Sequence, residues 1–216
     1  MNVVYFATGQ KSAEQAELAA EALRITNPGA RPWVLTDMHT QFRTLEPFRM
    51  HCSQKTMIFD RTILQFNFLR EHGHALFLDS DCVVNKPLQG MFAGPLAVTK
   101  RKPPKAVPEQ IYNGGVLYGE GKEALRFWQS WVDTYQQIDR GAWEWWGDQM
   151  ILPVIVPHFQ VKVYESETHN FIPTKINLPF DELPANIVHF KGEKRKPWMP
   201  LYVDMLRERH ASLAAA

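Results

Sequence analysis

The sequence predicts a single α/β domain with a mostly parallel central sheet flanked by helices. Short apolar runs of strand composition alternate with longer segments of helical composition, and residues 2–36 follow the order strand, helix, strand, which forms a right-handed parallel crossover. The 216 residues are 45% hydrophobic and 22% charged, as in an ordinary globular domain with one core. This composition excludes a disordered, collagen-like or coiled-coil protein.

The charge and cysteine counts narrow the class further. Lys and Arg number 24 and Asp and Glu number 23, so the net charge of +1 produces no global field that attracts nucleic acid or membranes. The two cysteines, Cys52 and Cys82, supply neither a disulfide framework nor a four-thiolate zinc site. No apolar stretch approaches the ~18 residues of a membrane span, and the first residues do not form a signal peptide, so we expect a cytoplasmic protein.

The first third of the chain has clear boundaries between its elements. The expected elements are, in order, a buried strand at 2–7, a helix at 12–26, a strand at 32–36, a polar loop at 37–54, a helix at 55–71 and a buried strand at 75–78. Residues 12–15 (SAEQ) match a capping box that begins the first helix, and Asn27-Pro28-Gly29 ends it.

The rest of the chain continues the same alternation. We expect a strand at 96–99, a basic loop at 100–105, a glycine turn with a strand at 112–119, a helix at 122–138, strands at 161–163 and 187–190, and a closing helix at 201–210. The helix at 122–138 carries its aromatic residues on one apolar face, which predicts core packing rather than a platform for stacking sugars. A tryptophan cluster, Trp143, Trp145 and Trp146, precedes Gly147.

Two carboxylates follow the apolar strand at 75–78. Asp79 and Asp81 stand one residue apart at its carboxyl end, where ligands bind in open α/β sheets. Their oxygens suit Mg²⁺ or Mn²⁺, an ion normally shared with phosphate oxygens. The alternative is a surface turn, because Asp-Ser-Asp is also good turn chemistry, but the apolar strand directly before it favours the metal site.

A second candidate segment begins at His189. Its imidazole can complete a metal site begun by carboxylates, Gly192 would let the backbone approach a phosphate, and the cations at 194–196 can neutralise a diphosphate. The alternative is a solvated basic loop beside a core histidine.

Two shorter segments add possible contacts to a ligand. The glycines beside Asn113, Gly114 and Gly115, suit a close backbone contact with a ligand, or a plain β-turn. Asp148 could cap the helix that follows it, or present a carboxylate to a polyol together with the amide of Gln149.

The order and spacing of these four segments resemble the GT-A glycosyltransferases, most closely the retaining family 8 enzymes such as glycogenin and the bacterial galactosyltransferases. The matching motifs are the DxD at 79–81, Asn-small-Gly-Val at 113–116, Gly-Asp-Gln at 147–149 and a closing His-x-x-Gly-x-x-Lys-Pro-Trp at 189–198, which here has one extra residue before the lysine. That insertion leaves Lys194, Arg195 and Lys196 as alternatives for the residue that meets phosphate. The resemblance runs from residue 1 to about residue 198.

The resemblance implies a metal-dependent transfer of a hexose from a UDP-sugar to an acceptor hydroxyl, with retention. It implies a catalytic domain at 1–200, followed by a helix and tail at 201–216. It places Mn²⁺ or Mg²⁺ on Asp79, Asp81 and His189, and Gln149 and Asp148 beside the anomeric carbon. The implied contacts to the nucleotide, the diphosphate and the donor sugar are Phe6, Ala7, Thr8, Lys55, Arg61, Ser80, Asn113, Gly114, Gly115, Gly192 and Lys196.

Three other readings remain open from the sequence. A sugar nucleotidyltransferase would open with a glycine-rich loop, whereas residues 6–11 (FATGQK) are poor in glycine. A non-catalytic nucleotide-sugar-binding protein would keep the pocket without turnover. The acceptor is not identified by the sequence, and a saccharide and a hydroxylated DNA base are the two candidates. The DNA base requires that the basic loops at 100–105 and 191–196 contact phosphates. The alternative is that both loops are simply solvated.

Overall fold

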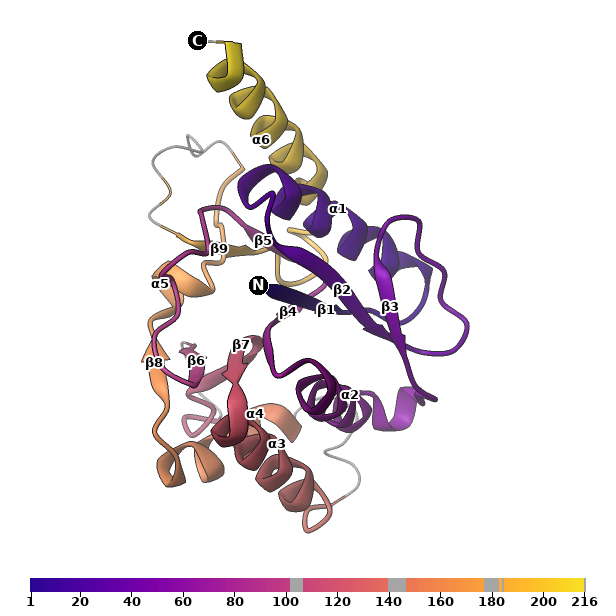
Figure 1. Cartoon of the computed structure of the whole chain (residues 1–216), viewed down its shortest axis with the longest axis vertical. Helices are drawn as coiled ribbons and strands as arrows, with labels where there is room; N and C mark the ends of the chain where they lie inside the picture. The colour runs from indigo at the N-terminus through magenta and orange to yellow at the C-terminus, as the bar shows by residue number, and fades with distance from the viewer. Residues whose placement is uncertain (102–106, 140–146, 177–182, 184, 216) are drawn as a thin grey trace.

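The computed structural model describes residues 1–101, 107–139, 147–176, 183 and 185–215. Its centre is a seven-stranded sheet in the order β3-β2-β1-β4-β7-β6-β8 (Figure 1). The strands are β1 (Asn2–Phe6), β2 (Arg31–Thr36), β3 (Glu46–Arg49), β4 (His74–Asp79), β6 (Leu96–Lys100), β7 (Tyr112–Glu120) and β8 (Lys162–Tyr164). Only β7 runs against its neighbours β4 and β6, and the other pairs are parallel. The expected mostly parallel α/β fold is confirmed.

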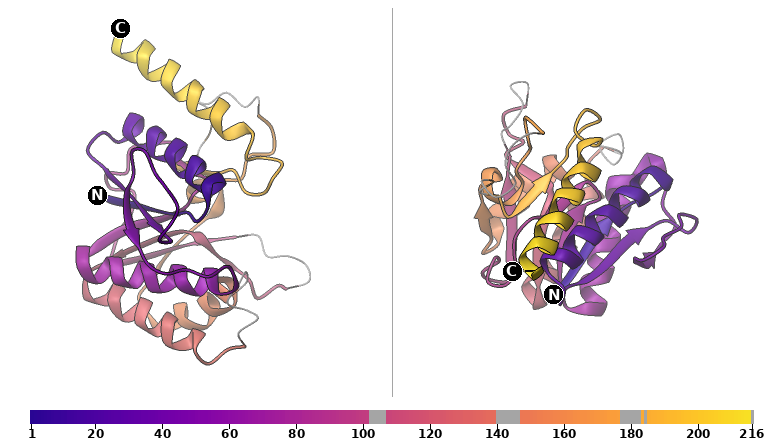
Figure 2. Two further views of the ribbon diagram at one scale, coloured as in Figure 1. Left: turned by 90° about the vertical axis from the view of Figure 1, so that its right-hand side faces the viewer. Right: turned by 90° about the horizontal axis from the view of Figure 1, so that it is seen from above.

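Helices cover both faces of this sheet (Figure 2). The helices are α1 (Gln10–Thr26), α2 (Met57–His72), α3 (Gly121–Tyr135), α4 (Gly147–Ile155), α5 (Ser166–His169) and α6 (Trp198–Ala215), with short 3-10 turns η1 (Gln54–Thr56) and η3 (Val156–His158). α1 and α6 lie side by side on one face, and α2 and α3 lie on the other. Each face buries its own hydrophobic cluster, so the sheet is the shared wall between two half-cores.

The aromatic face of α3 lies in the core, as its spacing predicted. Phe127, Trp128, Trp131 and Tyr135 are all buried in the cluster beneath α2 and α4. The indole nitrogen of Trp128 donates to Gln65 of α2 over 3.1 Å, which satisfies its buried polar group. These side chains therefore stabilise the fold and are not available to stack on a sugar.

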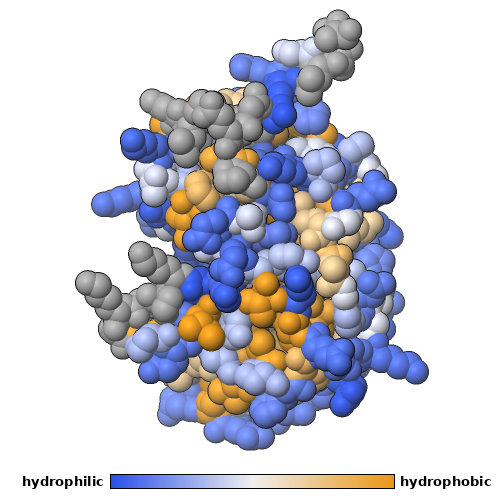
Figure 3. All heavy atoms as spheres, turned by 90° about the vertical axis from the view of Figure 1, so that its left-hand side faces the viewer, coloured by the Kyte–Doolittle hydropathy of each residue, from blue (hydrophilic) through white to orange (hydrophobic). Residues whose placement is uncertain are grey.

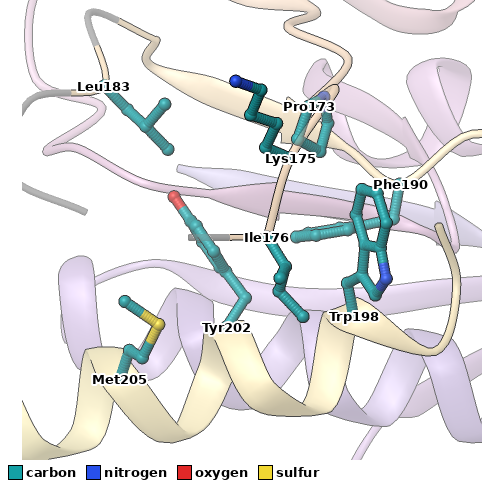
Figure 4. Close-up of a pocket in the computed structure, with 8 residues that line it drawn as sticks. All are labelled: Pro173, Lys175, Ile176, Leu183, Phe190, Trp198, Tyr202 and Met205. Carbon is teal, nitrogen blue, oxygen red and sulfur yellow. The ribbon is translucent and has the colours of Figure 1, made fainter. Parts of the chain in front are cut away.

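The closing helix α6 is longer than the expected 201–210 and packs into the α1 cluster through Met199, Val203 and Leu206. Beside it lies a small apolar hollow, in which Trp198 and Tyr202 face Phe190 (Figure 4). The amino group of Lys175 points away from the helix in this view. The lining residues that the structure describes are mostly apolar.

Local details differ from the sequence expectations in three places. α1 begins at Gln10, after Gly9 at φ +79°, and the Ser12 hydroxyl donates back to the carbonyl of Thr8, so no capping box forms. The polar segment 37–54 contains β3, because residues 46–49 pair with β2 at the edge of the sheet. The segment at 112–119 contains no glycine turn, since β7 runs through both glycines.

None of the helices in the described part of the chain is long and apolar enough to cross a membrane. Figure 3 shows the face at the left of Figure 1, where hydrophobic side chains gather in the lower half and hydrophilic ones surround them.

Candidate functional site

The pocket that holds most of the candidate residues lies at the carboxyl ends of β1 and β4. Since β7 is antiparallel to β4, its amino end reaches the same edge and brings Asn113 there. The volume is about 330 Å³, which suits a small-molecule site. The lining residues are Phe6, Ala7, Thr8, Ser12, Gln15, Met57, Ile58, Arg61, Asp79, Ser80, Asp81, Asn113, Asp148, Gln149, Lys191 and Lys196.

His189 is brought to the two carboxylates by a second, two-stranded sheet. In this sheet β5 (Cys82–Val84) pairs with β9 (Ile187–His189), so Cys82 lies opposite His189. Asp81 directly precedes Cys82 in the chain and is thereby brought beside the imidazole. The Nε2 atom of His189 lies 3.0 Å from Oδ1 of Asp81 and 3.7 Å from Oδ2 of Asp79. Cis ligands of an octahedral ion at about 2.1–2.2 Å are themselves about 3 Å apart, so the spacing fits Mn²⁺ or Mg²⁺.

A buried amide orients the imidazole toward the carboxylates. The Nδ1 atom of His189 lies 2.7 Å from Oδ1 of Asn170, and both residues are only 1% exposed. Since an amide oxygen only accepts, Nδ1 carries the proton and Nε2 faces Asp81. This is the arrangement by which proteins orient histidines that bind metals.

Charge and burial act in opposite directions on the residues of this cluster. Burial raises the pKa of Asp81, but the neighbouring His189 and Lys196 outweigh it and hold the pKa below its usual value, so the carboxylate stays ionised. Cys82 also lies within 4.8 Å of Asp81 and His189. Burial, together with Asp79 and Asp81, raises the pKa of its thiol well above the usual value. Two carboxylates and an imidazole are therefore the better ligand set for a hard cation.

Arg61 joins the two acidic parts of the site. Its Nη1 donates to Asp79 over 2.9 Å and its Nη2 donates to Asp148 over 3.0 Å, and its side chain is 5% exposed. Burial lowers the pKa of Arg61, but the carboxylates of Asp148 and Asp79 raise it by more. The net pKa lies above the usual value, so the guanidinium stays charged. We expected Arg61 to reach phosphates or sugar, whereas the structure uses both ends of its guanidinium to fix carboxylates.

Asp148 and Gln149 begin α4 and face the pocket. Oδ1 of Asp148 accepts from the backbone N–H of Gln149 over 2.8 Å, so the carboxylate both caps this turn and holds Arg61. Burial raises the pKa of Asp148 and Arg61 only partly offsets this. The Oε1 atom of Gln149 is buried and has no hydrogen-bond partner in the described structure. A polar atom in that position suits a polar or cationic ligand.

Gly114 and Gly115 of β7 let these side chains approach the sheet. A Cβ on Gly114 would lie 2.2 Å from Oδ2 of Asp148, and a Cβ on Gly115 would lie 2.5 Å from Oδ2 of Asp79. Both distances are well below an ordinary contact. The glycines thus provide a close approach, as one of the two sequence readings proposed, but to protein side chains rather than directly to a ligand.

The remaining sequence candidates are placed unevenly. Phe6, Ala7, Thr8, Ser80 and Asn113 line the pocket as expected. Lys55 lies exposed on η1 and does not line it. Gly192, at φ +85°, begins the turn that follows β9 without lining the pocket.

Among the three alternatives for the phosphate contact, Lys196 is the one that lines the pocket. Arg195 donates to the backbone carbonyls of Pro173 and Lys191, and Lys194 is exposed. Lys196 also pairs with Glu193 at 3.1 Å, an exposed contact that a ligand can displace. Of the three, Lys196 is therefore the one placed to reach a ligand in the pocket.

Several residues of the site were given no role in the donor site from the sequence. These are Ser12, Gln15, Met57, Ile58, Lys191 and Asn170. Lys191 lies inside the segment 189–198, two residues after His189, so its position near the metal ligands could have been predicted. Asn170 carries no local signal, because only the pairing of Phe171 with Val188 brings it beside β9. The expected tryptophan cluster at 143–146 and most of the basic loop at 100–105 lie outside the described residues.

No protein-family model and no curated protein matches the chain. Solved structures do match. A glycosyltransferase involved in glycosylation of the major capsid of PBCV-1 is 16% identical, with a TM-score of 0.63 over 93% of this chain and 97% of that one. Galactosyltransferase LgtC, in complex with donor and acceptor sugar analogues, is 15% identical, with a TM-score of 0.65 over 98% and 96%.

A third match is the apo-form glycosyltransferase GlyE of Streptococcus pneumoniae TIGR4, 17% identical, with a TM-score of 0.62 over 98% of this chain and 63% of that one. At these identities the likeness establishes the fold. The chain has the GT-A fold of these glycosyltransferases, as its motif order indicated.

Proposed function

We propose that the protein is a metal-dependent glycosyltransferase that moves a hexose from a nucleotide-sugar, with UDP as the expected nucleotide, to an acceptor hydroxyl with retention. The observation that carries the proposal is the convergence of Asp79, Asp81 and His189 on one point, in a pocket that Asp148 and Gln149 also line. That convergence occurs at the carboxyl edge of a GT-A sheet, where ligands of open α/β folds bind.

The cation is assigned to Asp79, Asp81 and His189, where it would neutralise charge on the departing diphosphate. Lys196 and Lys191 line the same side of the pocket and add positive charge to it. Arg61 lines the pocket as well and holds Asp79 and Asp148 in place through its two ion pairs. The leaving-group half of the site thus rests on residues from β4, β9 and the turn after β9.

The sugar is assigned to the part of the same pocket that Asn113, Asp148 and Gln149 line. Asn113 and Asp148 would accept hydrogen bonds from sugar hydroxyls, and the unpartnered Oε1 of Gln149 would face the anomeric carbon as it becomes positive. The bond from C1 to the diphosphate breaks, the acceptor oxygen bonds to C1 on the same face, and the acceptor proton passes to the departing phosphate oxygen. Holding the acceptor hydroxyl near C1 supplies much of the acceleration.

The test begins with calorimetry of UDP binding, with and without Mn²⁺. We expect Mn²⁺-dependent binding to wild type that Asp81→Asn loses and that the exposed variant Asp133→Asn on α3 keeps. If wild type binds none of UDP, GDP, ADP and CMP, the proposal is contradicted. Donor-hydrolysis assays and acceptor screens follow. If Gln149→Ala still binds UDP but releases less hexose than wild type, the protein is an enzyme and not a non-catalytic nucleotide-sugar-binding protein.

A hydroxylated DNA base as acceptor gains no support from the described residues. Lys100 pairs with Glu165 at 2.7 Å, and the guanidinium of Arg195 donates to two backbone carbonyls. Two of the cations that such an acceptor would need are thus in contact with other groups of the protein.

A further inference from the structure

Arg101 stands at the site without a role in the chemistry described above. It directly follows β6, and since β6 runs parallel to β4, it emerges at the same sheet edge as Asp79. Its backbone N–H donates to Ile111, two residues before Asn113 on β7. Arg101 therefore lies near Asn113 and Asp148, two of the residues assigned to the sugar, although it does not itself line the pocket.

The guanidinium of Arg101 is partly buried, and no carboxylate of the described residues forms an ion pair with it. Its Nη1 is buried and has no hydrogen-bond partner in the described part of the chain. Asp148 is close enough to act on its charge, but the ion pair of Asp148 is with Arg61 and not with Arg101. Burial accordingly lowers the pKa of Arg101 more than Asp148 raises it. A buried guanidinium nitrogen in this state favours an anionic partner from outside.

The neighbouring residue shows that this placement is specific to Arg101. Lys100 is exposed and pairs with Glu165, so its charge is compensated on the surface. The pocket itself is lined by three carboxylates and three cations. A divalent ion would balance the two charges of a nucleotide-sugar diphosphate, so Arg101 adds a positive charge that the donor phosphates do not need.

We propose that Arg101 binds a carboxylate or phosphate carried by the substrate at the sugar end of the site. The planar fork of a guanidinium fits both groups in a bidentate manner. The anion has two possible sources, a uronate on the donor sugar or an acidic group on the acceptor. This inference rests on the proposed function and names the substrate class of the same site.

The test compares matched neutral and anionic ligands on wild type, Arg101→Gln and Lys100→Gln. In the donor arm, calorimetry with Mn²⁺ measures UDP-glucose against UDP-glucuronate. In the acceptor arm, binding of glucose is compared with glucuronate and glucose 6-phosphate on the enzyme loaded with UDP and Mn²⁺. We expect one arm to show a preference for the anion of about tenfold to a hundredfold, lost in Arg101→Gln and kept in Lys100→Gln.

The arm that shows the preference identifies the source of the anion. No preference in either arm, or an equal loss of neutral and anionic ligands in Arg101→Gln, would overturn the inference while leaving the proposed function standing if UDP still binds. Absence of UDP binding to wild type would overturn the proposed function and this inference with it. The folded state of Arg101→Gln is checked by its UDP affinity, which the inference expects to match wild type.

Discussion

Replacing Gly114 by alanine tests how closely the side chains of Asp148 and Arg61 pack on the sheet. The new methyl group would lie 2.2 Å from Oδ2 of Asp148 and 2.8 Å from Nη2 of Arg61, where an ordinary contact needs at least 3.4 Å. Asp148 is 5% exposed and held at both oxygens, so it cannot swing away without breaking its pair with Arg61. The carboxylate must therefore move by about 1 Å.

Such a shift has two measurable consequences. Overpacking costs about 1–3 kcal/mol, and a 1 Å displacement near the reacting atoms lowers the rate about a hundredfold. For a chain of this size we expect the melting temperature to fall by about 2–12 °C. We expect the rate of donor hydrolysis to fall about a hundredfold.

Differential scanning fluorimetry and a donor-hydrolysis assay measure the two effects. The matched control is Gly29→Ala, because a Cβ there meets nothing within 4 Å. A Gly114→Ala protein with the melting temperature and turnover of wild type would show that the glycine is dispensable and that the reasoning about close approach is wrong.

Three further changes test other contacts. Arg61→Gln should cost about 3–5 kcal/mol in urea unfolding, because it leaves the Asp148 carboxylate buried without its cation; Arg126→Gln, at an exposed pair on α3, should cost less than about 1 kcal/mol, and equal losses would contradict a special role for Arg61. Asn170→Ala should weaken Mn²⁺ binding about 10–100-fold in a calorimetric titration, since it removes the acceptor that orients His189; unchanged affinity would contradict that orientation. Burial raises the pKa of Glu17, but hydrogen bonds from Thr44 and Arg43 outweigh it and leave the pKa below the usual 4.5. Its stabilisation is therefore present above about pH 4.5 and is lost as the pH falls through the folded pKa. Glu17→Gln should accordingly unfold at a lower urea concentration than wild type at pH 7, and the difference should narrow as the pH falls through the folded pKa of Glu17.

The sequence was most informative where chemistry and local pattern coincide. Asp79 and Asp81 follow an apolar run, and the fold then places them at the site because carboxyl ends of parallel strands share an edge. The core position of Trp128 and Trp131 followed from helical spacing alone. In these cases the relevant interactions are within one element, or depend only on the class of sheet.

Other features depended on contacts between distant segments. The edge strand β3 has a polar sequence, and it pairs only because β2 lies beside it. Lys55 shares the composition of the helix start but lies on η1, turned to solvent. The role of Arg61 likewise depends on two carboxylates that follow it by 18 and 87 residues. No local pattern carries that information.

The short ladder between β5 and β9 has a consequence for how the molecule is assembled in time. His189 reaches Asp81 only once residues 187–189 have returned to β5, secured by a hydrogen bond from the N–H of Phe190 to the carbonyl of Asp81. A growing chain therefore presents the carboxylates long before the imidazole. A cation that needs all three ligands would join last, and would stabilise finished molecules by mass action rather than guide their folding.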